Sequence, residues 1–167
     1  MYDESKRFAE SAVHAYVQTH GITGNIARIF NTYGPNMQIN DGRVVTNFIY
    51  QALHGNEITI YGTGEQTRSF SYIEDTVNGI LKIMTNSNSD VFNVGNDNEI
   101  SIKFLAERIL ELTNSNSKII YKDLPKDDPK QRKPDLTKIK NKFDYEPMFS
   151  LEEGLKITIN WVQKNYK

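Results

Sequence analysis

Tyr2 and Lys6 are the residues of this 167-residue chain whose types and spacing point most directly to chemistry. On a helix, two residues that are four positions apart lie on one face, about one turn from each other. A lysine ammonium beside a phenol favours the phenolate and lowers the pKa of the phenol from about 10. Such a pair could take a proton from a hydroxyl group while hydride leaves the same carbon. The spacing alone is weak evidence, because a chain with nine tyrosines meets it easily by chance.

The elements that would position this pair alternate between helix and strand, which predicts an α/β or α+β architecture. Apolar residues at three- and four-residue spacing predict helices over 2–20, 43–53, 74–84, 102–112 and 134–142, and a last helix after Ser150. Short runs rich in branched residues predict strands over 25–30, 58–61, 69–72, 91–94 and 117–121. Residues 31–41 are expected to form a loop, and Gly62-Thr63-Gly64 a turn between two strands. Ser101 and the Ser150/Glu153 capping box should start the helices that follow them.

The composition limits the class of protein and of site. The chain is 38% hydrophobic with a net charge of −1, as globular proteins are, and this balance gives no electrostatic reason to expect nucleic acid. No apolar run approaches the roughly 18 residues of a membrane helix. There are no cysteines to form disulfides or thiolate metal sites, and the three histidines lack ligand spacing. We therefore expect a cytoplasmic protein that uses no metal and binds neither nucleic acid nor membrane.

Five stretches of the sequence resemble one enzyme family. YDESKRFAE from Tyr2, ARIFNTYGP from Ala27 and YGTGEQTRSFSYIED from Tyr61 resemble the extended short-chain dehydrogenases/reductases, the NAD-dependent epimerases and dehydratases of sugar nucleotides. NDGRVVTNFI from Asn40 and DDPKQRKPD from Asp127 look like the UDP-glucuronate decarboxylase (UDP-xylose synthase) branch. The resemblance runs in order along essentially the whole chain, and this collinearity is more specific than any single motif.

The resemblance assigns roles to eight residues. It implies that Tyr2 is the catalytic base and that Lys6, Thr32 and Arg43 lie with it at the NAD cofactor, whereas the residues that match substrate-binding positions are Tyr16, Asn31, Arg68 and Arg132. The planar fork of arginine suits phosphate oxygens, which agrees with the role of the two substrate-side arginines.

Each substrate-side residue also has a structural interpretation that the sequence leaves open. Arg68 and Arg132 could form surface ion pairs, Asn31 could be a turn residue before Gly34-Pro35, and Tyr16 lies on an apolar helix stripe and could belong to the core. Asp75 is expected to cap the helix over 74–84 and to be structural.

The reaction implied by the resemblance is redox-neutral decarboxylation of UDP-glucuronate to UDP-xylose. Oxidation at C4 with NAD gives a ketone β to the carboxylate, carbon dioxide leaves, and hydride returns. Two alternatives stay open: a nucleotide-sugar 4,6-dehydratase or 4-epimerase, and a non-catalytic fragment that binds a nucleotide sugar or a partner subunit.

The sequence departs from the family in its first half. It contains no Gly-x-Gly-x-x-Gly after a strand, no acidic ribose-binding residue and no Ser or Thr partner before Tyr2. We therefore predict the C-terminal part of an extended short-chain dehydrogenase: an incomplete Rossmann sheet plus a small α/β substrate domain. Residues 1–35 would be a Rossmann remnant and 36–167 mainly the sugar-nucleotide region, with 73–100 returning to the Rossmann part.

Three expectations follow from this incomplete sheet. Apolar surface of the first helix and first strand should be exposed, and the isolated chain should bind NAD poorly and turn over slowly or not at all. A homodimer or a separate N-terminal half is expected as partner, besides the UDP-sugar substrate.

Overall fold

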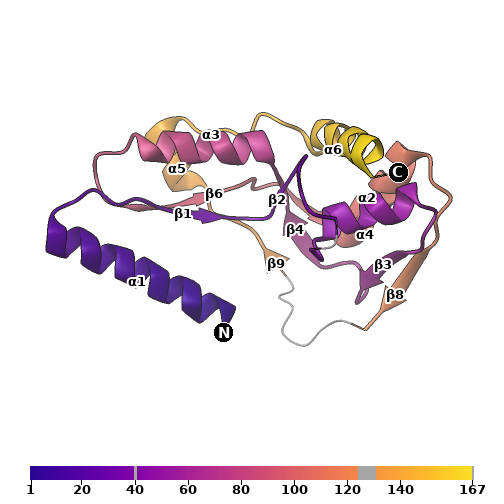
Figure 1. Cartoon of the computed structure of the whole chain (residues 1–167), viewed down its shortest axis with the longest axis horizontal. Coiled ribbons are helices and arrows are strands. Elements are labelled where there is room, and N and C mark those ends of the chain that lie inside the picture. Colours follow the sequence, from indigo (N-terminus) through magenta and orange to yellow (C-terminus); the bar gives the residue numbers. More distant parts are fainter. Residues whose placement is uncertain (40, 124–130, 167) are drawn as a thin grey trace.

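The computed structural model describes residues 1–39, 41–123 and 131–166, except for the side chains of Tyr2 and Gln131. The predicted α/β fold is confirmed, with helices and strands alternating along the chain (Figure 1). The helices are α1 Tyr2–His20, α2 Val44–Leu53, α3 Ile73–Met84, α4 Ile102–Thr113, α5 Thr137–Phe143 and α6 Leu151–Asn165. The strands are β1 Ile26–Ile29, β2 Thr32–Tyr33, β3 Ile58–Tyr61, β4 Thr67–Ser69, β5 Ser71–Tyr72, β6 Val91–Val94, β7 Glu99–Ser101, β8 Ile119–Lys122 and β9 Gln131–Arg132.

A small core lies at the end of the molecule that holds β1 and β6. These strands pair in parallel, with Ile26 opposite Val91 and Ile29 opposite Val94. Helices α3 and α5 lie beside them, as Figure 1 shows. The buried members of this core are Ile83, Phe92, Val94, Leu136, Ile139 and Tyr145. The core therefore joins segments from three distant parts of the sequence.

A larger core fills the other end of the molecule, between α2, α4 and α6 and the parallel pair β3–β8 (Figure 1). The inward residues of β3, Ile58 and Ile60, are fully buried, and the alternate residues Thr59 and Tyr61 are more exposed. This alternation is what a strand with one covered face requires. Helix α4 starts where predicted, since the Ser101 hydroxyl accepts a hydrogen bond from the Phe104 amide, and the Ser150/Glu153 capping box opens α6.

Five short strands connect the two ends and hold the segments that line a pocket. Strand β2 pairs in parallel with β5, and β4 lies between antiparallel β7 and parallel β9. Parallel pairs need long connections, so each of these strands brings a distant segment alongside its neighbour.

Several expectations about local structure are wrong. Gly62-Thr63-Gly64 does form a turn between two strands, as predicted, but the strand after it starts at Thr67 instead of Ser69 and does not pair with β3, which pairs with β8. The predicted loop over 31–41 contains strand β2, which is too short to show a sequence pattern, and β7 and β9 were missed for the same reason. Residues 124–130 of the polar stretch, and Asn40, lie outside the described residues.

Asp75 is structural, as expected, but it does not cap its own helix. The N-cap of α3 is Tyr72, which makes no side-chain capping hydrogen bond. The fully buried Asp75 carboxylate instead accepts hydrogen bonds from the Met148 amide at 2.8 Å and the Phe149 amide at 3.2 Å. It therefore fixes the segment that leads into α6.

Helix α1 lies along the edge of the small core and leaves much of its apolar stripe uncovered. The exposed fraction is 76% for Phe8 and 63% for Tyr16, and Ile29 of β1 is 54% exposed. The expected exposure of apolar surface on the first helix and first strand is confirmed. Within the described ranges, no helix is both long enough and apolar enough to span a membrane.

Gly154, in the first turn of α6, is required by packing. A Cβ atom at this position would lie 2.8 Å from Cζ of Tyr33 and 2.9 Å from Cδ2 of Tyr72. We predict that Gly154→Ala lowers the free energy of unfolding by roughly 2–3 kcal/mol, as overpacking of a core does. Urea denaturation measures this change.

The control for this prediction is Asn160→Ala, an exposed position on the same helix, which should change stability little. Adding Tyr33→Phe to Gly154→Ala removes the hydroxyl that meets the new methyl group and should recover part of the loss. Equal stability of Gly154→Ala and the wild type would contradict the close packing described.

Candidate functional site

A pocket of about 570 Å³ lies where the two ends of the molecule meet. It brings together four of the predicted site residues: Asn31, Thr32, Arg43 and Arg132. These come from the end of β1, from β2, from the start of α2 and from β9. Its other lining residues are Asp3, Ile29, Phe30, Tyr33, Met37, Val44, Val45 and Phe70. The pocket thus combines one apolar wall with two arginines and an amide.

Asn31 and Thr32 are held by β5 and the first turn of α3. The carbonyl of Asn31 accepts a hydrogen bond from the Ser71 amide at 2.9 Å. The Thr32 hydroxyl lies 3.0 Å from the carbonyl oxygen of Phe30, to which it donates, and 3.0 Å from the hydroxyl of Thr76. Asn31 is therefore more than a turn residue before Gly34-Pro35, because its side chain lines the pocket at a fixed backbone position.

Arg43 is the N-cap residue of α2 and stands at the mouth of the pocket. Its Nε lies 3.1 Å from a carboxylate oxygen of Asp41, and its side chain is 63% exposed. The guanidinium carries five N–H donors, so one ion pair leaves others that could bind a ligand.

Arg68 and Arg132 lie at the same level on neighbouring strands. The parallel register of β4 and β9 makes them Cα partners. Arg68 is buried, and its guanidinium donates to the carbonyl of Thr67 at 2.7 Å, whereas Arg132 is exposed and lines the pocket. The surface ion-pair interpretation does not fit Arg68, because its side chain is inside the molecule. Like charges opposite each other on a sheet repel, so an anion between them would be stabilising.

The first turn of α1 reaches the same pocket through Asp3. Asp3 was not identified as a site residue from the sequence. Its position directly after Tyr2 in the predicted helix is the feature that could have pointed to it. Lys6 lies one turn further along the exposed α1. The position of the Tyr2 side chain lies outside the described part of the structure, so the geometry of the Tyr2–Lys6 pair stays a prediction.

Tyr16 lies away from the pocket, near the other end of α1. Its ring packs against His20 with the centroids 4.4 Å apart, and it is largely exposed. The core interpretation of Tyr16 is therefore wrong, and its substrate-side role stays a prediction.

Tyr33 is a pocket residue that the sequence reasoning missed. Its hydroxyl donates to the carbonyl of Leu151 at 3.2 Å, which ties the pocket wall to the start of α6. Burial raises the pKa of Tyr33 far above 10, with the nearby Tyr72 and Asp75 adding to the shift. The phenol consequently stays protonated and acts as a wall and a tether rather than as a base.

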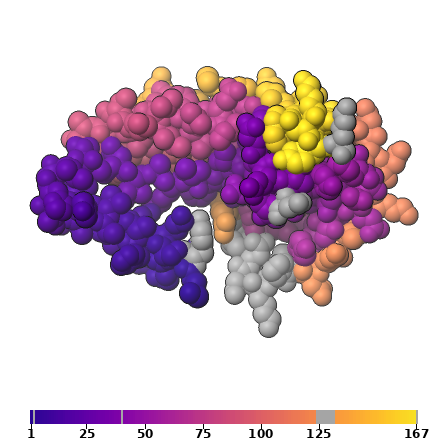
Figure 2. All heavy atoms as spheres, in the orientation of Figure 1, coloured from indigo at the N-terminus to yellow at the C-terminus, as the bar shows by residue number. Residues whose placement is uncertain are grey.

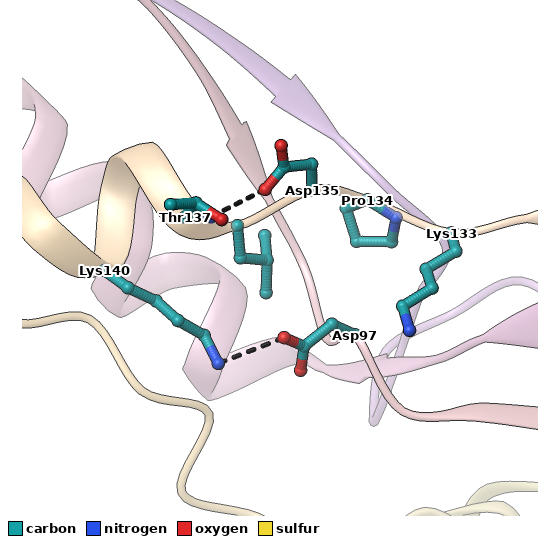
Figure 3. Close-up of a pocket in the computed structure, with 7 residues that line it drawn as sticks. Asp97, Lys133, Pro134, Asp135, Thr137 and Lys140 are labelled. Atoms are coloured by element: carbon teal, nitrogen blue, oxygen red, sulfur yellow. Dashed lines mark hydrogen bonds and ion pairs between the residues drawn. The ribbon is translucent and has the colours of Figure 1, made fainter.

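A second pocket, of about 710 Å³, holds none of the predicted site residues. Figure 3 shows Lys140 pointing toward Asp97, 3.1 Å away, and the Asp135 carboxylate beside Thr137, whose amide it binds at 2.9 Å. Lys140 also pairs with Glu146 at 3.1 Å. Cations and carboxylates at this pocket largely neutralise each other, so it lacks the excess positive charge of the first.

Comparison with known proteins gives relatives for nearly the whole chain. UDP-glucuronic acid decarboxylase 1 of Xenopus tropicalis is 48% identical over 163 residues, which are 98% of this chain and 39% of that protein. UDP-glucuronic acid decarboxylase 5 of Arabidopsis thaliana is 49% identical over 154 residues, 92% of this chain and 45% of that protein. The chain therefore spans less than half the length of these curated relatives.

Solved structures share the fold. UDP-glucose 4-epimerase of Thermotoga maritima, solved with UDP-glucose, has a TM-score of 0.95 and 31% identity over 99% of this chain and 54% of its own. UDP-glucuronic acid 4-epimerase of Bacillus cereus, solved with UDP-glucuronic acid and NAD, has a TM-score of 0.87 and 26% identity over 94% of this chain and 50% of its own.

A family model covers the segment that carries Tyr2, Lys6, Asn31 and Arg68. The model of the NAD dependent epimerase/dehydratase family matches residues 1–95, more than half of the chain. Together with relatives that are almost half identical, this match shows that the chain belongs to the NAD dependent epimerase/dehydratase family.

Proposed function

We propose that this chain carries the Tyr–Lys helix and the sugar-nucleotide pocket of an NAD-dependent UDP-glucuronate decarboxylase. The observation that carries the proposal is the single pocket in which Asn31, Thr32, Arg43 and Arg132 meet beside the first turn of α1. Identity of 44–49% to eight proteins named UDP-glucuronic acid decarboxylase supports this reaction within the family. The division into a 1–35 remnant and a 36–167 region, with 73–100 returning, belongs to the same proposal.

The two arginines on β4 and β9 account for recognition of the UDP diphosphate. Guanidinium groups bind the phosphate oxygens of a diphosphate bidentately, and two arginines at one level of the sheet offer two such groups. Asn31 adds an amide that can donate to a phosphate or sugar oxygen from a backbone position fixed by β5. The apolar wall of Met37, Val44 and Phe70 can cover a flat or apolar ligand face.

The described residues can hold only one end of a dinucleotide. Arg43 and Thr32 line the pocket and offer donors that suit a ribose or an amide, and Lys6, one turn beyond Asp3 on α1, is assigned to the same ligand. The sequence contains no glycine-rich turn after a strand for the pyrophosphate. When bound, NAD supplies the acceptor and later the donor of the hydride.

The chain's own residues then have defined tasks in the proposed reaction. The Tyr2 phenolate takes the proton of the sugar 4-hydroxyl, and the Lys6 ammonium stabilises that phenolate. The resulting 4-ketone is β to the C5 carboxylate, so it accepts the electron pair left when carbon dioxide departs. Arg68 and Arg132 keep the diphosphate in place throughout.

A 4-epimerase is the second candidate, favoured by the overall likeness to UDP-glucose 4-epimerase at a TM-score of 0.95. The two reactions share the first oxidation and diverge at the carboxylate, so the product distinguishes them. A binding-only protein is the third possibility and predicts affinity for UDP without any product.

Binding of UDP tests the pocket itself. We predict that the purified chain binds UDP and that Arg132→Gln weakens binding by about tenfold or more, since a hydrogen bond to a charged group contributes roughly 1.5–3 kcal/mol. Isothermal titration calorimetry measures the Kd. Arg108→Gln is the matched control, because Arg108 pairs with Glu111 and Glu152 away from the pocket. An unchanged Kd for UDP in Arg132→Gln would contradict the proposed diphosphate site.

Product analysis tests the reaction. We predict that a chimera, in which residues 1–167 replace the aligned part of the Xenopus tropicalis decarboxylase, converts UDP-glucuronate with NAD to UDP-xylose and carbon dioxide. Tyr2→Phe should lower turnover by about 10²–10⁴-fold, the usual contribution of a general base. Tyr121→Phe, an exposed tyrosine on β8, is the control. Formation of a 4-epimer without carbon dioxide would establish the second candidate. The absence of any product would support the third possibility, a protein that only binds the nucleotide sugar.

A further inference from the structure

Helix α1 carries Tyr2, Asp3 and Lys6 at one end, and Asp3 at that end lines the pocket. The helix lies to one side of the strands in Figure 1, and Figure 2 shows open space between part of it and the rest of the molecule. Nearly all of its residues are exposed. Whatever fixes the angle of α1 therefore decides where its first turn lies relative to the pocket.

The C-terminal end of α1 is anchored by close packing. The helix ends at Gly21 in the left-handed conformation, and the chain returns past it at Gly24. A Cβ atom on Gly24 would lie 2.6 Å from Cγ2 of Val17, so the backbone there touches the helix directly. This contact is about 22 Å from Tyr2 along the helix, at 1.5 Å per residue. A tilt of ~5° about it would move the first turn by about 2 Å.

One ion pair fixes the middle of the helix to strand β1. Nε of Arg28 lies 2.7 Å from one carboxylate oxygen of Glu10, and an Nη lies 2.6 Å from the other. This is the bidentate arrangement that fixes orientation as well as distance. Hydrogen bonding to Arg28 lowers the pKa of Glu10, and the same bond raises the pKa of Arg28, so both groups stay charged at neutral pH.

The other ion pair described on α1 cannot do this. Arg7 and Glu4 lie 3.9 Å apart on the helix itself, with side chains 79% and 77% exposed. A pair within one helix leaves its angle to the sheet unchanged. Of these two ion pairs, the Glu10–Arg28 pair joins α1 to a strand.

We propose that Glu10 and Arg28 are positioning residues that set the angle of α1 and thereby bring Tyr2 and Lys6 to the pocket. Arg28 lies on β1, three residues before Asn31. The ion pair therefore fixes the position of α1 relative to the strand that leads into the pocket wall. Neither residue lines that pocket, and both act through the helix. The role in turnover rests on the proposed function, whereas the fixed angle of α1 does not.

The angle can be measured directly, because the chain contains no cysteine that would compete for a label. Spin labels are placed at Phe8→Cys on α1 and Asn160→Cys on α6, both exposed, and their distance distribution is recorded by pulsed electron paramagnetic resonance. We expect Glu10→Gln and Arg28→Gln each to broaden the distribution at least twofold. The charge swap Glu10→Arg with Arg28→Glu should restore much of the narrow distribution.

Arg108→Gln is the matched control, because it breaks an ion pair between α4 and α6 and leaves α1 untouched. Its distribution should stay as narrow as that of the unsubstituted labelled chain, at a similar loss of Tm. An unchanged width in Glu10→Gln, or equal broadening in Arg108→Gln, would overturn the proposal. The charge swap distinguishes loss of the ion pair from misfolding, because exchanging the two charges restores the pair but would not repair a misfolded chain.

Turnover gives the functional readout. Where carbon dioxide is released from UDP-glucuronate, Glu10→Gln should lower kcat about tenfold or more and leave KM within twofold, since a 1 Å misplacement of a reacting group can cost on the order of 10²-fold. A higher KM in Glu10→Gln with an unchanged kcat would contradict a role that acts through the position of α1. A chimera without turnover counts against the proposed function alone, and the spin-label experiment then decides the angle of α1.

Discussion

The connection between the small core and the large core depends on the hydrogen bonds that the buried carboxylate of Asp75 accepts. It lies in the first turn of α3, where the partial positive charge of the helix N-terminus stabilises an anion. Its two oxygens accept the backbone amides of Met148 and Phe149, which lead into α6. One residue thus connects the helix of the small core to the last helix of the large core. Without it, two backbone donors would be left without these partners in the interior, at a cost of roughly 1–3 kcal/mol each.

The pocket exists because parallel strands place distant segments side by side. Strand β2 needs β5 to fix Asn31 and Thr32, and β9 needs β4 to bring Arg132 opposite Arg68. The apolar wall combines Val44 and Val45 of α2 with Met37 and Phe70, and Val45 and Phe70 belong to the large core. The short strands bring this wall together with the polar residues Asn31, Thr32 and Arg132.

The longer elements could be predicted from the sequence because their signals are local. The stripe of α4, the Ser101 cap and the Ser150/Glu153 capping box each lie within one turn or one helix. The two-residue strands β2 and β9 could not be predicted, because their pairing depends on residues tens of positions away, whereas β5 falls within the predicted strand over 69–72. The same distinction holds for the site. Asn31, Thr32, Arg43 and Arg132 were identified through family motifs and do meet in one pocket, whereas Asp3 and Tyr33 join it through tertiary contacts that no motif specifies.

The register of β4 and β9 has a consequence for how ligand and sheet depend on each other. With Arg68 and Arg132 as Cα partners, pairing of β9 with β4 sets two arginines side by side at one level of the sheet. In the proposed function, an anion bound by both side chains would favour the paired form of these strands. A ligand that binds only the paired form stabilises it by RT ln(1 + [L]/Kd). The stability of the β4–β9 pair would therefore rise with the concentration of the ligand. Under the proposed function, the stability of this small sheet would then report whether an anionic ligand occupies the pocket.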